Sequence, residues 1–150
     1  MNSLVLIIQI AGRRCAIAAA DVKSVIDLGT IAPVPRAPAF IAGLTTLRSQ
    51  ALTVIDCRLA LGLADDAWPS DPRAAVIAVE GHSYALMVDA IEDITQSLGE
   101  PGQIPGGFGA AWQNAARGLI ETGIGPALLL DLVQLIAGPD AAQGRNLRAA

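Results

Sequence analysis

The amino-acid sequence predicts a mainly β protein built from two copies of a five-stranded unit. Short runs rich in Val, Ile and Leu recur along the chain, with Gly, Pro and Asp between them. This alternation is typical of strands joined by turns. The second half of the chain also repeats the pattern of the first. With 150 residues, of which 53% are hydrophobic, the chain is large enough for one domain with a substantial core.

The expected elements follow these apolar runs in order. Strands are expected at residues 4–10, 14–18, 25–28, 41–47, 52–55, 74–79, 84–88, 91–95 and 128–130, with a weaker strand at 118–122. Short helices are expected at 58–61 and 131–136. Asp131 would cap the second helix, because its carboxylate can accept from the free amides of the first turn. Many short strands favour a barrel or a sandwich over βαβ units.

The internal repeat appears at two shifts. A shift of 69 residues places 7–10 on 76–79, Gly12 on Gly81, Val22 on Ile91 and Val25 on Ile94; a shift of 75 places 54–56 on 129–131. Units of about 70 residues lie near the lower limit for an independent core. The two copies should therefore share an interface, and a groove between them would be a natural docking site.

The irregular segments divide the chain. We expect one domain over 1–140, with subdomain 1 at about 4–63 and subdomain 2 at about 74–137. The N-terminal strand could pack across, and 139–150 would form a C-terminal tail. The linker at 63–73 is rich in Asp and Pro, Pro33, Pro35 and Pro38 stiffen a connector, and the glycine-rich stretch 99–109 is expected to be irregular.

Charge and hydropathy exclude several classes of partner. The net charge is −4, Lys23 is the only lysine, and the nine arginines are scattered. Nucleic-acid binding needs a clustered basic face, and an anionic membrane surface also attracts basic segments. No apolar run approaches the ~18 residues that span a bilayer, and no basic residue precedes 4–10 as in a signal peptide. A cytoplasmic chain without membrane insertion is expected.

No catalytic residue, metal site or cofactor is expected. His82 is the only histidine, and a solvated turn residue is favoured over a metal ligand because no second histidine could share the metal. The serines lack a neighbouring base and carboxylate. Gly106, Gly107 and Gly109 form a glycine-rich segment without the lysine of a phosphate-binding loop. Cys15 and Cys57 are interpreted as small core thiols. The chain is therefore not expected to be an enzyme.

Arg48 lies at the turn of an apolar hairpin over 43–58. Two interpretations remain open at this point. The arginine could contact a partner, because arginine is enriched at interface hot spots. Alternatively, it could form an ion pair with Asp56 or another local acid, or simply be solvated.

The motifs around this hairpin resemble the CheW family of chemotaxis coupling proteins, over roughly residues 4–137. Family members carry Gly-x-x-Asn-Leu-Arg-Gly followed by Pro-x-x-Asp-Leu-Arg. The corresponding residues here are Gly43, Thr46, Leu47, Arg48 and Ser49, then Thr53, Asp56, Cys57 and Arg58. A glycine turn leading to a Val-Asp strand end matches Gly81 through Val88 and Asp89, and the approach matches Pro35, Pro38, Phe40 and Ile41. Thr46, Ser49, Thr53, Cys57 and Ala85 depart from the family pattern, and Ser49 would strain a turn that needs positive φ.

The resemblance implies two SH3-like five-stranded β-barrels packed together, with short helices at the barrel ends. It implies a cytoplasmic adaptor, peripheral to receptor arrays at the inner membrane, that bridges methyl-accepting chemoreceptors to the CheA histidine kinase. In the family the receptor's helical hairpin tip packs between the barrels, and the regulatory domain of the kinase docks on a barrel end. Carried onto this chain, the receptor or kinase site comprises Val22, Val25, Arg48, Ile91 and Ile94. The motif or structural residues are Gly43, Leu47, Asp56, Arg58, Gly81 and Asp89.

Two alternatives remain beside this expectation. The chain could be a CheW-like scaffold for another receptor and histidine-kinase pathway, such as a twitching, developmental or orphan pathway. It could also be a small-ligand-binding barrel that uses the groove, although it lacks a base, a nucleophile and a metal set.

Overall fold

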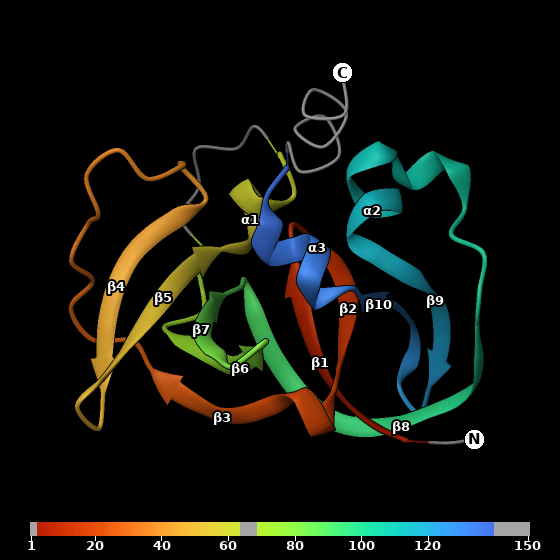
Figure 1. Cartoon of the computed structure of the whole chain (residues 1–150). Coiled ribbons are helices and arrows are strands. Elements are labelled where there is room, and N and C mark those ends of the chain that lie inside the picture. The colour runs from red at the N-terminus through yellow and green to blue at the C-terminus, as the bar shows by residue number, and fades with distance from the viewer. Residues whose placement is uncertain (1–2, 64–68, 140–150) are drawn as a thin grey trace.

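A computed structural model describes residues 3–63 and 69–139 and contains two five-stranded sheets in these ranges (Figure 1). The first sheet is a closed barrel, barrel A, with the order β1-β2-β10-β9-β8. The second sheet, sheet B, has the order β3-β6-β7-β5-β4. Barrel A comprises β1 (Leu4–Ile10), β2 (Arg13–Ala18), β8 (Ala90–Gly102), β9 (Ala116–Thr122) and β10 (Gly125–Leu130). Sheet B comprises β3 (Val22–Asp27), β4 (Ile41–Leu47), β5 (Gln50–Asp56), β6 (Arg73–Val79) and β7 (His82–Met87). The expected mainly β fold with two five-stranded units is confirmed.

The two sheets do not coincide with the expected stretches 4–63 and 74–137. Barrel A takes β1 and β2 from the first repeat and β8 to β10 from the second, whereas sheet B takes β6 and β7 from the second repeat and β3 to β5 from the first. The 3-10 turn η1 (Ala19–Asp21) follows β2 at once and leads into β3, which pairs with β6. Each five-stranded unit is therefore assembled from both halves of the chain.

The internal repeat is also a repeat of strand register. The β1–β2 ladder runs from Val5 opposite Ala18 to Ile10 opposite Arg13, and the β6–β7 ladder matches it at a shift of 69 residues. The parallel pairing of β5 with β7 is likewise reproduced by β10 with β2. Each half thus contributes the same five strands, used in the same way, to the opposite positions of the molecule.

The core consists of one large cluster between the sheets and a smaller cluster within each sheet. On β1, Leu6 and Ile8 join the shared core, while Val5 and Ile7 fill barrel A. Because both faces of β1 are buried, its sequence is nearly all apolar instead of alternating. Sheet B encloses Leu52, Val54, Ala74, Val76, Ala85 and Met87.

Short helices lie at the ends of the sheets (Figure 1). Asp56 caps α1 (Cys57–Ala60), and Asp131 caps α3 (Leu132–Ala137), so both expected helices are present. Helix α2 (Ala110–Ala115) was not expected, because it lacks a capping side chain and forms around the buried Trp112. No helix within the described ranges is long and apolar enough to cross a membrane.

Several boundaries differ from expectation. The prediction of an irregular stretch over 99–109 was wrong at its start, because β8 continues to Gly102 and pairs there with β9. Near its end, this stretch contains the 3-10 turn η2 (Gly106–Phe108). Strand β3 begins earlier than expected, at Val22. The expected tail beyond residue 139 and the linker residues 64–68 lie outside the described residues.

The two sheets close differently. In barrel A, β8 pairs with β9 through Ser97, Leu98 and Gly102. In sheet B, the corresponding contact is a single bridge between Ala32 and Leu44. The connector before β4 contains three prolines, which cannot donate to a ladder. A cavity of about 540 Å³ lies beside this connector.

One close approach occurs in both halves at equivalent glycines. A Cβ on Gly43 would lie 2.4 Å from the Ala32 carbonyl oxygen, and a Cβ on Gly118 would lie 2.6 Å from the Gly102 carbonyl oxygen. Both glycines stand at the irregularity where β4 or β9 meets its hairpin partner. The backbones of the connector and the strand can approach only because no side chain intervenes.

We predict that Gly118→Ala lowers the free energy of unfolding by about 1–3 kcal/mol, because the added Cβ forces the β8–β9 contact apart. The matched control is Gly106→Ala, where no atom lies within 4 Å of the added carbon. Urea unfolding followed by circular dichroism measures both. Equal effects of the two substitutions would contradict this account of the closure.

Candidate functional site

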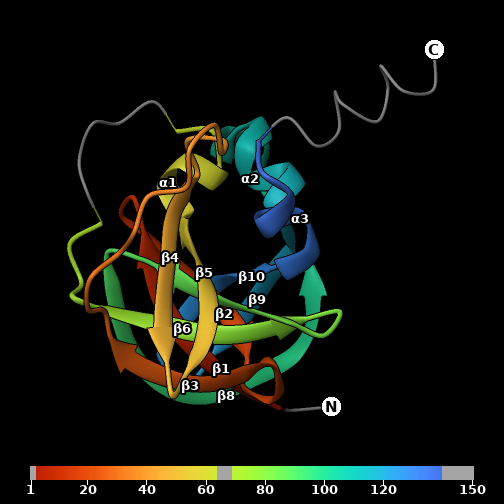
Figure 2. The same cartoon turned by 60° about the vertical axis from the view of Figure 1, so that its left-hand side comes forward.

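Four of the predicted site residues lie on the two strands that cross between the repeats. Val22 and Val25 on β3 stand opposite Ile77 and Ala75 of β6. Ile91 and Ile94 on β8 stand opposite Ile8 and Leu6 of β1, the equivalent positions of the other half. Figures 1 and 2 both show β3 and β8 running along the same side of the molecule. The structure therefore places these residues at matching positions.

The same four residues separate into an inner and an outer pair. Ile91 is only 8% exposed and belongs to the shared core, against which the partly buried Val22 packs. Val25 and Ile94 are 39% and 55% exposed. The inner pair thus holds the crossing strands on the core, and the outer pair presents apolar side chains to solvent.

Two further exposed apolar residues extend the barrel A side of this surface. Leu4 is opposite Gln96 and close to Ile94 along the ladder, and Leu98 follows at the next outward position of β8. Their exposed fractions are 53% and 44%. Sequence reasoning missed both. The alternation of Ile94, Gln96 and Leu98 was the available signal, but the strand expected from the sequence ended at residue 95. We call Val25, Ile94, Leu4 and Leu98 the apolar surface.

Arg48 lies at the exposed tip of the β4–β5 hairpin, which both views place beside β3. Asp56 stands at the opposite end of β5, where its carboxylate accepts from the N–H groups of Arg58 and Leu59 at 3.1 and 3.3 Å. The ion pair with Asp56 considered from the sequence is therefore wrong. No hydrogen bond or ion pair to another described residue engages the Arg48 guanidinium, which is placed where a partner could contact it.

The motif residues Arg58 and Asp89 form an anchor between the two repeats. Arg58 Nε lies 3.1 and 2.9 Å from the two carboxylate oxygens of Asp89. The Ala11 N–H donates to the same carboxylate at 2.7 Å and the Ser70 N–H at 3.3 Å. Burial by itself would raise the pKa of Asp89, but the hydrogen bonds from Arg58, Ala11 and Ser70 outweigh it and lower the pKa. The anchor sits directly before β8 and fixes where that strand begins.

A second ion pair holds the backbone of Ile91. The Ile91 N–H donates to Asp71 Oδ2 at 2.8 Å, and Arg73 Nη2 donates to the Ile91 carbonyl oxygen at 2.9 Å. Arg73 also bonds Asp71 at 3.0 Å, which lowers the pKa of the Asp71 carboxyl. Asp71 and Arg73 thus bond the N–H and C=O groups of Ile91 as a neighbouring strand would. This role could not be predicted, because Asp71 lies in the segment 63–73 that was expected to be a linker.

The remaining motif residues support the fold. Leu47 packs against the core of sheet B. Gly81 has φ 83° in the β6–β7 turn, and His82 is exposed at the start of β7. Burial raises the pKa of the Asp56 carboxyl, and its hydrogen bonds from the α1 amides oppose this only in part.

The β4–β5 turn has positive φ at both central residues, 51° at Arg48 and 69° at Ser49. This conformation suits a tight hairpin but favours glycine. The strain expected at Ser49 is thus present. The equivalent β9–β10 turn carries Gly123 and ends on Gly125.

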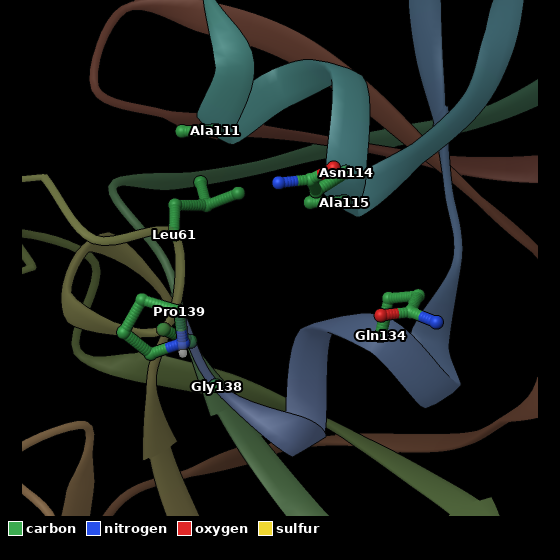
Figure 3. A pocket seen from close by; sticks show the side chains of 8 residues that line it. Leu61, Ala111, Asn114, Ala115, Gln134, Gly138 and Pro139 are labelled. Atoms are coloured by element: carbon green, nitrogen blue, oxygen red, sulfur yellow. The ribbon is translucent and has the colours of Figure 1, made fainter. Parts of the chain in front are cut away.

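The cavities offer little to a small ligand. The pocket between the three helices has a volume of about 30 Å³ (Figure 3), about the share of one water molecule in the liquid. In the larger cavity beside the connector, Ser70 and Asp71 already bond within the protein. Within the described ranges, no group of three His, Cys, Asp or Glu could hold a metal ion. Burial raises the pKa of the Cys15 and Cys57 thiols, which disfavours the reactive thiolates.

Comparison with protein families decides the assignment. The CheW-like domain matches residues 4–139, almost the whole described chain. The chain belongs to the CheW-like domain family. The sequence resemblance is thereby confirmed, and so is the expectation of a CheW-like scaffolding protein that is not an enzyme.

Individual relatives of this CheW-like protein are distant. It is 22% identical over 134 residues to the chemotaxis protein CheW of Treponema pallidum (strain Nichols), covering 84% of this chain and 77% of that protein. Among solved structures, it is similar to the scaffolding protein TtCheW of Thermoanaerobacter tengcongensis, with a TM-score of 0.74 and 20% identity. That match covers 88% of this chain and 86% of the other and establishes the shared fold.

We predict that Ser49→Gly raises the free energy of unfolding by about 1 kcal/mol, because glycine adopts positive φ without a clash of Cβ. Thermal and urea unfolding measure the change. Ser83→Gly, in a β-strand, is the control and should destabilise. A loss of stability in Ser49→Gly would show that the serine side chain contributes more than its backbone strain costs.

We predict that Asp89→Asn lowers the free energy of unfolding at pH 7 by about 1–3 kcal/mol, since a hydrogen-bonded, largely buried charge pair is broken. The folded pKa of Asp89 lies below its ordinary value, so its contribution is complete above about pH 4 and is lost as the pH falls further. The difference between wild type and variant should therefore shrink towards pH 2.

Urea unfolding from pH 7 to pH 2 tests this dependence. Asp93→Asn is the control, because Asp93 is exposed and, among the described residues, its carboxylate accepts only from the neighbouring Ile94 N–H. A stability difference for Asp89→Asn that stays constant across the whole range would rule out the charged anchor.

Proposed function

We propose that this chain is a cytoplasmic adaptor that couples methyl-accepting chemoreceptors to the CheA histidine kinase, at receptor arrays beneath the inner membrane. The single observation that carries the proposal is that Val25 and Ile94 are both exposed at equivalent positions of β3 and β8, with the tip of the β4–β5 hairpin beside β3. Membership of a scaffold family supports a role in binding and not in catalysis.

The chemistry of the surface suits a helical partner. An amphipathic helix docks through apolar side chains laid into a hydrophobic surface. Val25 and Ile94 supply such contacts from both halves of the molecule, and Arg48 adds an exposed cation of the residue type enriched at binding hot spots. We assign the cytoplasmic hairpin of a receptor to this surface and the regulatory domain of CheA to a barrel end.

Binding measurements on the full chain test the receptor site. We predict that Ile94→Ala and Arg48→Ala each weaken binding of a receptor cytoplasmic hairpin about 10-fold or more, which corresponds to ~1.4 kcal/mol. Val133→Ala is the matched control, because Val133 is 48% exposed but lies on α3. Isothermal titration calorimetry measures the affinities, and circular dichroism verifies that the variants fold.

The outcomes separate the parts of the proposal. Binding of both the receptor hairpin and the kinase regulatory domain, with only the receptor affinity reduced by these substitutions, supports the assignment. Binding of neither partner by the folded wild-type chain would refute it. Unfolding of Arg48→Ala would instead give Arg48 a structural role.

A scaffold role in another receptor and kinase pathway is the second candidate. The observation that favours it is the cluster of departures at the hairpin, where Thr46, Ser49 and Thr53 replace the family residues. Thr46 and Ser49 lie on or beside the tip that presents Arg48, and Thr53 lies further along β5, opposite Leu44. Titration with receptor hairpins from chemotaxis and from twitching or developmental systems distinguishes the two candidates by which hairpin binds more tightly.

A further inference from the structure

The first hairpin of each repeat is held in its sheet by strand ladders to the other repeat. In the described chain, no ladder connects the first hairpin of a repeat to the remaining strands of the same repeat. Four ladders run between the repeats: β1 with β8, β2 with β10, β3 with β6, and β5 with β7. Separated from its partner, the first repeat would consist of two hairpins and a single strand.

The polar contacts follow the same pattern. The Gln9 amide donates to Glu92 at 2.8 Å, and Arg58 pairs with Asp89 at 2.9 Å. Ser3 and Ser97 also bond one another. Each of these contacts joins the first repeat to the second.

The shared core is divided in the same way. Ile8 and Ile17 from the first repeat pack in one cluster with Ile77 and Leu86 from the second. An isolated two-stranded hairpin is only marginally stable in water. A repeat without its complement would therefore expose its core.

We propose that a second copy of this chain is a structural partner, with which it exchanges repeats. In the resulting dimer, β1 to β5 of one chain and β6 to β10 of the other form one complete unit with both sheets. The remaining strands of the two chains form a second such unit. Every ladder, the Arg58–Asp89 anchor and the shared core are retained, because each joins two repeats regardless of the chain that supplies them. The monomer and the exchanged dimer differ in whether the two repeats of a unit come from one chain or from two.

Chain connectivity sets the conditions for exchange. Covalent linkage gives the two repeats of one chain a high effective concentration, on the order of millimolar, so the monomer prevails in dilute solution. Refolding at high protein concentration allows a repeat from another chain to compete. Once formed, the dimer persists on dilution, because its return to monomer requires opening four ladders.

The exchanged dimer would be a bivalent scaffold. Each of its two units carries one complete set of crossing strands and therefore its own Val25, Ile94 and Arg48. Two copies of the apolar surface in one dimer can engage two binding partners at once, which raises avidity without any new contact.

Refolding of two tagged forms of the full chain tests the exchange. The forms carry tags of different mass, are unfolded together in denaturant, and are refolded at low and at high protein concentration. Size-exclusion chromatography with light scattering should show a dimer only after concentrated refolding, containing both tags and stable on dilution. Monomer alone at every concentration would overturn the proposal. So would a mixed dimer that forms when the native proteins are simply combined, because that would be surface association.

Complementation provides the second test. Ile8 and Ile77 are equivalent positions with 0% exposure, and Ile8→Asp or Ile77→Asp should each prevent folding by burying a charge. Refolded together, the two variants can build one unit from their unaltered repeats. The control combines Ile8→Asp with Ile17→Asp, both in the first repeat, which cannot complement.

Circular dichroism and size exclusion read the result. Folded dimer from the Ile8→Asp and Ile77→Asp mixture, absent from the control mixture and from either variant alone, supports exchange. A mixture no more folded than the control overturns it, and this outcome says nothing against receptor binding by the monomer.

Discussion

The pairing of β8 with β1, and of β3 with β6, is the constraint on which the rest of this structure depends. β8 pairs with β9 of its own repeat and with β1 of the other, and β3 pairs with β6 of the other repeat, so both strands join the two repeats within one sheet. Removing either pairing would open a sheet and expose the shared core formed around Ile8 and Ile77. The two sheets therefore cannot be treated as independent barrels that happen to touch. They are one cooperative structure made of reciprocal parts.

The same constraint positions the candidate site. Because β3 and β8 carry out equivalent crossings, Val22 and Ile91 are held inward at matching positions, and Val25 and Ile94 are held outward. The crossings are not equally reinforced. Asp71 and Arg73 hold the backbone of Ile91, and Asp89 secures the approach to β8, whereas Leu4 occupies the position that corresponds to Arg73 in the other half. The part of the apolar surface on β8 is thus held more firmly than the part on β3.

Much of the strand pattern could be predicted from the sequence. The assembly of each sheet from strands of both repeats could not. The alternation around Thr45 and Val54 and the continuous apolar run of β1 identify strands locally. The shift that relates Ile8 to Ile77 identifies the repeat. However, pairing within a repeat and pairing between repeats use the same residues in the same register, so the pattern contains no information on which occurs. Helix α2 depends on burying Trp112, which is a tertiary contact and leaves no capping signal.

The site was predictable to a similar degree. The equivalence of Val25 and Ile94 came from the repeat, and the exposure of Arg48 agrees with its place in a turn. The sequence could not show that Asp56 lies at the far end of β5 from Arg48, or that Asp71 holds Ile91, because both depend on strand direction and on contacts between distant segments. Leu4 and Leu98 gain significance only from their register beside Ile94.

Native-state hydrogen exchange tests the reciprocal assembly most directly. Amides of β1 and β10 in barrel A and of β5 and β7 in sheet B are compared as denaturant is added. We predict that the most protected amides of both sheets exchange with the same free energy and the same denaturant dependence, because each sheet contains strands of both repeats and packs on the shared core. Exchange of one sheet through a separate, lower-energy opening, while the other stays protected, would contradict it.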